Sequence, residues 1–161
     1  MWLEQEEWLG SSLIKQYPLQ LISGQPHNRL HSQLDNGSES QKDKISGREA
    51  VKIHPQDALA RKLKNGDIVE IFNKRGKCLA GVIVSKEVMQ GVIFLPVGAW
   101  YDPIDDGGYC VHGNPNVLTA DIGTSSLSQG PSAHSTLVEV KKFVKELPPI
   151  NIFQKPIIVN K

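Results

Sequence analysis

The densest group of side chains that could bind an anion runs from Ser23 to Asp35 and reads SGQPHNRLHSQLD. His27, Arg29 and His31 stand close together there, surrounded by serine and amide groups. An arginine offers a fork of N–H donors that matches a phosphate, and histidine and serine can add further donors. Phosphate binding is therefore one use of this pattern. A loop whose polar groups satisfy its own backbone has a similar composition and remains the alternative.

A zinc site is a third use of the same residues. His27 and His31 are four positions apart, the spacing of two metal ligands on one face of a helix. However, no glutamate follows the first histidine as in an HExxH motif, and the Gly-Gln-Pro lead-in does not begin a regular helix. Zinc is therefore the weaker hypothesis for this loop.

A second polar stretch runs from His112 to Gly130 and reads HGNPNVLTADIGTSSLSQG. Asn116 and Gln129 carry amides that can match the mixed donors and acceptors along the edge of a pterin or a guanine. An irregular connection rich in capping residues has the same composition, so composition does not separate the two interpretations.

The remaining polar and sulfur-containing residues indicate no further site. Asp102, Asp105 and Asp106 lack the ligand spacing of a calcium loop, so we expect a solvated turn. Cys78 and Cys110 form no CxxC pair and are expected to be free, partly buried thiols. The sequence also contains no GxSxG elbow, Walker A loop or Rossmann fingerprint.

The composition is that of one globular domain. The chain has 161 residues, of which 39% are hydrophobic and 22% charged, and its formal net charge is +1. This length supports one hydrophobic core, and the near-neutral charge argues against a nucleic-acid partner. The longest apolar run, from Gly91 to Trp100, is too short to span a bilayer, so no membrane insertion is expected. The acidic N-terminus does not resemble a secretion signal.

The elements that must position the two loops are mainly β-strands. Pro55 suits the first turn of a helix over residues 55–63, and Gly66 follows its end. Residues 36–47 are polar and turn-rich and are expected to form an exposed loop. Apolar runs predict strands over residues 17–23, 50–53, 67–73, 79–85, 91–97 and 135–140. This order predicts a small β-barrel with a helix over one end.

Three parts are expected along the chain. Residues 1–16 contain apolar side chains in only loosely helical spacing and are expected to lead in from an upstream domain, with a short docked helix as the alternative. Residues 17–145 should form the barrel. Residues 146–161 contain three prolines and should form an extended tail.

Ten short motifs, in order along the chain, carry a resemblance to a known family. They are RLHSQL at 29–34, GRE at 47–49, IHPQDA at 53–58, NGDIV at 65–69, FNKRG at 72–76, GAWY at 98–101, NVLT at 116–119, DIGTS at 121–125, LSQ at 127–129 and LPP at 147–149. The sequence resembles the C-terminal molybdopterin-guanine-dinucleotide-binding domain of the dimethyl sulfoxide reductase superfamily. The similarity is greatest to the trimethylamine-N-oxide reductases and biotin sulfoxide reductases.

The resemblance implies a double-psi β-barrel of the aspartate-decarboxylase type, mainly β with one or two helices. It implies a bis(molybdopterin guanine dinucleotide) molybdenum cofactor, bound together with upstream domains of a bacterial oxidoreductase. Such enzymes reduce S-oxides or N-oxides by oxygen-atom transfer. The residues expected to contact the cofactor by motif position are Ser23, Gln25, His27, Arg29, His31 and Ser32 at pterin or phosphate groups, and Asn116 and Gln129 at a pterin or guanine edge. No catalytic or metal-ligating residue is expected in this chain, so it should have no turnover alone.

The resemblance leaves several properties open. Relatives occur in both the periplasm and the cytoplasm, and neither the oxide substrate nor the electron-donor protein is indicated. The alternative function is that of a stand-alone double-psi barrel that binds a protein, or of a truncated remnant, because fold does not fix function. Without a ligand, we expect both loops to be more mobile than the strands, since their polar groups await a partner.

Overall fold

The structure, a computed structural model, describes residues 4–104, 109–127, 129–155 and 158. The strands in this part of the chain are β1 Leu19–Ile22, β2 Ala50–Ile53, β3 Ile68–Phe72, β4 Lys77–Val84, β5 Val92–Phe94, β6 Tyr109–Cys110 and β7 Leu137–Lys142. They follow the order β2-β5-β1-β7-β3-β4-β6, and a further pairing of β2 with β4 closes six of them into a ring. The short strand β6 lies outside the ring beside the start of β4.

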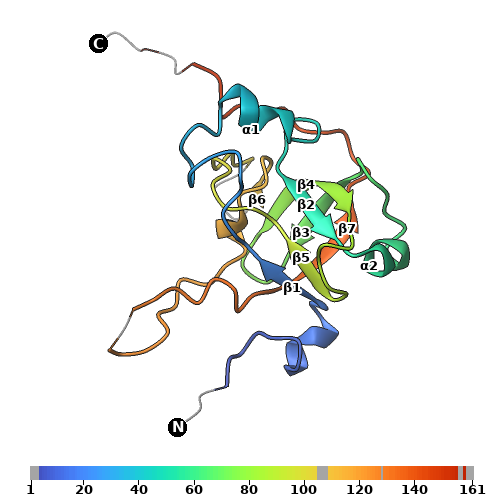
Figure 1. Ribbon diagram of the computed structural model, residues 1–161, viewed down its shortest axis with the longest axis vertical. Coiled ribbons are helices and arrows are strands. Elements are labelled where there is room, and N and C mark those ends of the chain that lie inside the picture. The colour runs from blue at the N-terminus through green and yellow to red at the C-terminus, as the bar shows by residue number, and fades with distance from the viewer. Residues whose placement is uncertain (1–3, 105–108, 128, 156–157, 159–161) are drawn as a thin grey trace.

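The ring mixes parallel and antiparallel neighbours. β1 pairs with β5 and β2 with β4 in parallel, and the other four pairs around the ring are antiparallel. Parallel neighbours require crossover connections, so the chain must pass over the barrel between these strands. The predicted double-psi β-barrel is confirmed. Figure 1 shows the strands gathered at the centre of the molecule, with the helices α1 and α2 outside them.

The helices begin and end at recognisable signals. Helix α2, Pro55–Ala60, has proline in its first turn, and the His54 ring accepts a hydrogen bond from the Gln56 amide at 3.3 Å. It stops before the predicted Leu63 because Lys62 adopts a φ of 55°. Two short 3₁₀ turns, η1 Ser12–Lys15 and η2 Pro115–Val117, complete the helical elements of the described residues.

The segment 36–47 differs from the expected open loop. It contains a short helix, α1 Ser38–Lys42, which begins after an extended Gly37. Ser40 is buried in this helix, and its hydroxyl donates to the Asp35 carboxylate at 3.2 Å. A polar contact with Asp35, just before the helix, therefore helps to fix it. The local sequence is too polar to predict it by periodicity.

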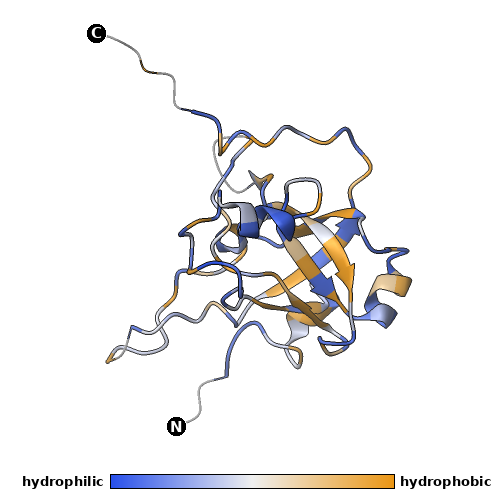
Figure 2. Cartoon of the chain, turned by 45° about the horizontal axis from the view of Figure 1, so that its top comes forward, coloured by the Kyte–Doolittle hydropathy of each residue, from blue (hydrophilic) through white to orange (hydrophobic). Residues whose placement is uncertain are grey.

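The barrel interior is built from residues that alternate along the strands. In β1 and β2, every second residue is buried, and the largest of these side chains are fully enclosed: Leu19, Leu21, Val51 and Ile53. Burying one such side chain contributes about 1.5–3 kcal/mol. Figure 2 shows hydrophobic residues along the strands and polar residues at several strand ends. Within the described residues, no helix is both long enough and apolar enough to cross a membrane.

The two cysteines are free, as predicted, but are more fully buried than expected. Cys78 and Cys110 are both 0% exposed and lie opposite each other in the β4–β6 register. Burial raises the pKa of the Cys78 thiol well above its ordinary value, and the neighbouring Cys110 and Glu70 add to the shift. Both side chains therefore act as small core residues.

The expectation of a solvated turn at Asp102 is wrong, and Asp105 and Asp106 lie outside the described residues. Asp102 is 4% exposed, and its carboxylate accepts the backbone amides of Asn151 at 2.7 Å and Ile152 at 3.1 Å. Arg48 donates to the Pro148 carbonyl in the same segment. These contacts fasten residues 148–152 to the barrel, although the segment has no regular secondary structure.

The N-terminal segment is also attached to the barrel. Glu7 is 7% exposed and receives two hydrogen bonds from the Arg75 guanidinium, at 2.5 and 2.8 Å. The Leu137 amide of β7 donates to the same carboxylate at 2.9 Å. Burial opposes ionisation of Glu7, but these hydrogen bonds and the Arg75 charge outweigh it, so the pKa of Glu7 is lowered.

Candidate functional site

The first polar loop leaves β1 and remains attached to the chain that follows β5. The Leu95 amide donates to the Ile22 carbonyl at 3.0 Å, and the Val97 amide donates to the Gly24 carbonyl at 3.0 Å. Further along, the Trp100 indole N–H donates to the Ser32 carbonyl at 2.7 Å. The loop is therefore held at both its start and its tip.

The tip of the loop has a strained backbone. His31 and Leu34 have φ values of 50° and 62°, in the left-handed region that side chains other than glycine rarely occupy. Gly98 makes this geometry possible, because a Cβ atom on it would lie 1.8 Å from the His31 carbonyl oxygen. Strain of this kind persists only where the surroundings enforce it, and it is frequent at binding sites.

The strained tip exposes most of its side chains. His31 and Ser32 are exposed, and Leu30 and Leu34 are 57% and 71% exposed. Exposed leucines beside hydrogen-bonding groups are typical of a surface that another molecule or domain covers.

Arg29 points the other way, into the protein. Its side chain is 0% exposed, and its guanidinium donates to Glu49 at 2.9 Å, to Ser40 at 3.1 Å and to the Val97 carbonyl at 2.8 Å. Its Nε lies 3.6 Å from Asp35. A phosphate could reach this guanidinium only if these contacts opened, so the structure places Arg29 under the loop rather than on its exposed face.

Arg29 is one member of a buried charge cluster. Lys44 lies 2.8 Å from Asp35 and 2.9 Å from Glu49, and the side chains of Lys44, Asp35 and Glu49 are at most 5% exposed. The His112 ring is 0% exposed, 3.6 Å from Asp35 and 3.0 Å from the Trp100 carbonyl. We use the term buried charge cluster for the five residues Arg29, Asp35, Lys44, Glu49 and His112.

The protonation states in the cluster follow from burial and neighbouring charge. Burial alone would raise the pKa of Asp35, but hydrogen bonds from Lys44 and the Trp100 amide and the Lys44 charge outweigh it, so its pKa is lowered. Burial lowers the pKa of His112, and the Lys44 charge adds to this shift. Asp35 is therefore ionised and the His112 imidazole neutral near neutral pH.

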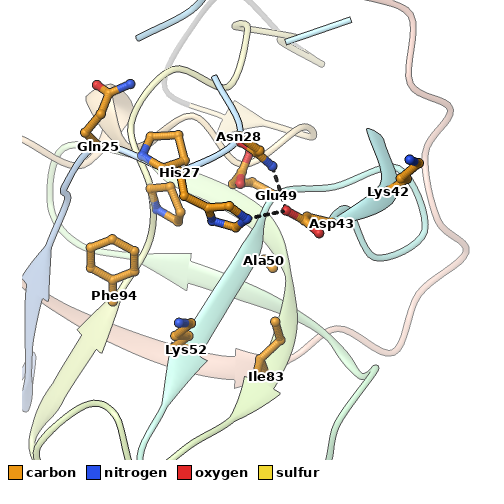
Figure 3. Close-up of a pocket in the computed structure, with 12 residues that line it drawn as sticks. Gln25, His27, Asn28, Lys42, Asp43, Glu49, Ala50, Lys52, Ile83 and Phe94 are labelled. Atoms are coloured by element: carbon orange, nitrogen blue, oxygen red, sulfur yellow. Dashed lines mark hydrogen bonds and ion pairs between the residues drawn. The ribbon is translucent and has the colours of Figure 1, made fainter. Parts of the chain in front are cut away.

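Ser23, Gln25 and His27 lie nearer the start of the loop. Ser23 is 8% exposed, and its hydroxyl has no hydrogen-bond partner among the described residues. Gln25 donates to the Arg29 carbonyl at 2.7 Å, and the His27 ring lies 3.5 Å from Asp43. Figure 3 shows His27 pointing toward Asp43 across the top of a pocket.

This pocket has a volume of about 590 Å³ and a mixed lining. Gln25 and His27 lie on its rim, and Phe94 and Ile83 belong to its apolar wall. Such a combination of an apolar wall and a polar rim suits a flat ring with polar edges. No group of three His, Cys, Asp or Glu side chains in the described ranges could hold a metal ion, so the zinc hypothesis has no structural support there.

The second loop begins inside the protein and then turns outward. His112 and Gly113 are buried, and η2 follows, with the Asn114 side chain accepting the Asn116 amide at 2.9 Å. Residues 121–127 are exposed, and Figure 1 shows this part of the chain extending away from the barrel.

The two amide residues predicted in the second loop do not lie together. Asn116 is exposed and lines a shallow pocket of about 320 Å³ with Tyr101, Asn114 and Val117. Gln129 is exposed and donates to the Ser125 carbonyl at 2.9 Å. Of the predicted cofactor residues, Ser23 and Arg29 are buried and the others are exposed on the two loops, and they do not converge on one pocket within the described part of the chain.

Comparison with known proteins identifies the type of domain. Residues 19–137 match the family described as "Molydopterin dinucleotide binding domain", which is most of the chain. The chain belongs to this family. The polar, partly strained loops described above are thus loops of a molybdopterin dinucleotide binding domain.

The curated relatives are reductases. The domain is 44% identical over 159 residues to trimethylamine-N-oxide reductase of Haemophilus influenzae, a match that covers 96% of the domain and 19% of that protein. It is 50% identical over 149 residues to trimethylamine-N-oxide reductase 1 of Escherichia coli K12, covering 89% of the domain and 18% of that protein. It is 46% identical over 140 residues to biotin sulfoxide reductase of Cereibacter sphaeroides, covering 87% of the domain and 18% of that protein. The chain thus spans about a fifth of the length of these relatives and corresponds to one domain of a larger protein.

A solved structure supports the same fold. The domain superposes on acetylene hydratase from Pelobacter acetylenicus with a TM-score of 0.71 at 18% sequence identity. The match covers 89% of the domain and 21% of that chain. At this identity the likeness concerns the fold alone.

Sequence reasoning missed several residues that shape the loops. Asp35, Lys44 and Glu49 lie in one stretch of the sequence, but His112 is far from them, and their types alone suggest ordinary surface charges. The motif GRE at 47–49 was the one available signal, because it recurs in the family resemblance. Only the fold brings these groups to one buried point.

Proposed function

We propose that this domain closes over a bis(molybdopterin guanine dinucleotide) molybdenum cofactor, together with the other domains of a bacterial S-oxide or N-oxide reductase. Membership of the dinucleotide-binding family and 44–50% identity to reductases support the proposal. The observation that carries it is the strained tip at His31 and Ser32, held by Gly98 and Trp100 and exposed to solvent.

The donors of the two loops fit such a cofactor. The dinucleotide carries anionic phosphates and heteroaromatic rings whose edges mix donors and acceptors. Imidazoles at His27 and His31 and a hydroxyl at Ser32 can meet the phosphates, and the Gln25 and Asn116 amides can meet ring edges. The buried Ser23 hydroxyl, without a described partner, is a further group that a ligand would satisfy.

We assign roles by this geometry. Contacts with pterin or phosphate groups are assigned to Ser23, Gln25, His27, His31 and Ser32. Contacts with a pterin or guanine edge are assigned to Asn116 and Gln129. Arg29, predicted from sequence as a direct contact, acts instead as a residue that positions the loop, because its side chain is enclosed. When bound, the molybdenum centre supplies the oxygen-atom transfer. The residues of this domain bind, orient and cover the cofactor, and none of them is catalytic.

The test measures cofactor retention in the full-length reductase that contains this domain. Gln25→Ala and Asn116→Ala each remove one proposed hydrogen bond, so bound molybdenum and releasable guanine nucleotide should fall about 3–10-fold per mole of protein. Gln56→Ala is the matched control, because Gln56 is an exposed amide on α2, away from both loops. Content that is equal in all three variants would contradict the assigned contacts.

A further inference from the structure

The buried charge cluster joins the two loops to each other. Asp35, at the end of the first loop, accepts the Trp100 amide at 2.9 Å and faces the His112 ring at 3.6 Å. Its backbone carbonyl also accepts a hydrogen bond from Gln41 at 2.7 Å. One carboxylate therefore touches the first loop, the chain after β5 and the first residue of the second loop.

Glu49 makes the complementary connection. Its carboxylate binds Arg29 of the first loop and Lys44, each at 2.9 Å. Its backbone amide donates to the His112 carbonyl at 3.1 Å. A Cβ atom on the next residue, Gly113, would lie 2.6 Å from the Glu49 Cβ, so the second loop begins in direct contact with Glu49.

Stability alone gives a poor reason for this arrangement. Taking charged groups out of water is costly, and a buried ion pair is often no more stabilising than apolar residues of the same size. Buried polar groups have directional bonds, however, and can fix one geometry among several packings. The cluster has two basic and two acidic side chains, and each acidic side chain lies within 3.6 Å of both basic ones.

We propose that Asp35 and Glu49 are positioning residues, which hold the two cofactor loops at a fixed distance and orientation so that one dinucleotide can contact both. The ligand in this statement rests on the proposed function. The other part of the proposal, that the two carboxylates connect the loops, concerns this chain alone and can be tested without the cofactor.

The first arm measures backbone hydrogen exchange in the 161-residue chain. Asp35→Asn and Glu49→Gln keep the side-chain volume and remove the charge. Exchange should rise about tenfold in both loops and at the Trp100 amide, which donates to Asp35, as expected for loss of one charge-assisted hydrogen bond. Amides in β3 and β7 should change less than about twofold, because the hydrogen bonds and ion pairs described for the cluster's side chains involve neither strand.

Matched controls come from two other carboxylates with lysine partners. Asp67 and Glu70 have side chains that are 9% and 8% exposed and pair with Lys142 and Lys141. Asp67→Asn and Glu70→Gln should leave exchange in both loops unchanged. Lys44→Arg keeps the cluster's charge and should also preserve loop protection, whereas a role in bulk stability would give equal effects for all the carboxylate variants.

A milder variant covers the case in which removal of a cluster charge prevents folding. Ser40→Ala removes the hydroxyl that donates to Asp35 and accepts from Arg29. Exchange should then rise about threefold in both loops, again without change in the strands. Increased exchange in the first loop alone, or equal increases in strands and loops, would overturn the coupling.

The second arm measures molybdenum and guanine content of the full-length enzyme with Asp35→Asn. Content reduced together with faster loop exchange supports the whole proposal. Faster exchange of both loops with unchanged content keeps the coupling and contradicts the ligand. Unchanged exchange overturns the coupling whatever the cofactor content, so the two failures are distinct.

Discussion

Replacement of Gly98 by alanine tests the geometry of the first loop most directly. Gly98 has a φ of 94°, and an added Cβ would lie 1.8 Å from the His31 carbonyl oxygen and 2.4 Å from its carbon. Both atoms belong to the backbone, so no side-chain rotation can relieve the contact. The His31 carbonyl would have to withdraw by more than an ångström, which also displaces the Ser32 carbonyl from the Trp100 indole.

The expected cost has three parts. A left-handed backbone costs alanine about 1–2 kcal/mol, forced backbone displacement about 1–3 kcal/mol and a weakened hydrogen bond about 0.5–1.5 kcal/mol. We therefore expect Gly98→Ala to lower the free energy of unfolding by about 3–6 kcal/mol, a large part of the stability of a typical domain.

Gly66→Ala is the matched control. Gly66 has a φ of 85°, close to that of Gly98, but nothing lies within 4 Å of its added Cβ. It should therefore carry only the backbone cost of about 1–2 kcal/mol. The difference between the two variants isolates the contact with His31.

Urea unfolding of the 161-residue chain, followed by circular dichroism and tryptophan fluorescence, gives both free energies. Equal destabilisation by Gly98→Ala and Gly66→Ala would refute the close approach of Gly98 to the loop tip. A change in the slope of the unfolding free energy against urea concentration would instead indicate an altered unfolded or native state.

Three further outcomes are expected. Asn73→Ala should cost about 2–4 kcal/mol in urea unfolding, because the buried side-chain amide donates to the Leu118 and Leu137 carbonyls at 2.8 and 3.2 Å and its oxygen accepts the Arg75 backbone amide at 2.9 Å. The pKa of His112 is lowered from 6.5 by burial, so its stabilising effect is present above about pH 6.5 and is lost as the pH falls below it. The fall in stability measured from about pH 7 to 5 should be smaller in His112→Gln, and an identical slope would contradict the buried neutral ring. Phe153→Ala should shift tryptophan emission to longer wavelength, because the Phe153 ring lies 5.4 Å from the Trp100 ring and its loss admits water; unchanged emission would contradict that contact.

Local patterns predicted the barrel well because its strands bury side chains at a period of two. The strands expected over residues 50–53 and 67–73 correspond to Ala50–Ile53 and Ile68–Phe72. Ends were less accurate where a single backbone angle decides them, as at Lys62 after α2. Helix α1 was missed because Ser40 is buried by a contact with Asp35, and no local periodicity signals such a contact.

The sequence by itself determined the fold class, the family and the two loops that carry the polar groups, because motif order and strand periodicity are local properties. The tertiary structure decided which of those groups face outward. Arg29 has the chemistry of a phosphate ligand, but its guanidinium donates to Ser40, Glu49 and the Val97 carbonyl and is enclosed among them. The residues around Asp102 predict a solvated turn, but the Asn151 and Ile152 backbone amides of the tail donate to its carboxylate. In both cases the partner is distant in sequence, and only folding determines whether a charged side chain meets water, a ligand or another part of the chain.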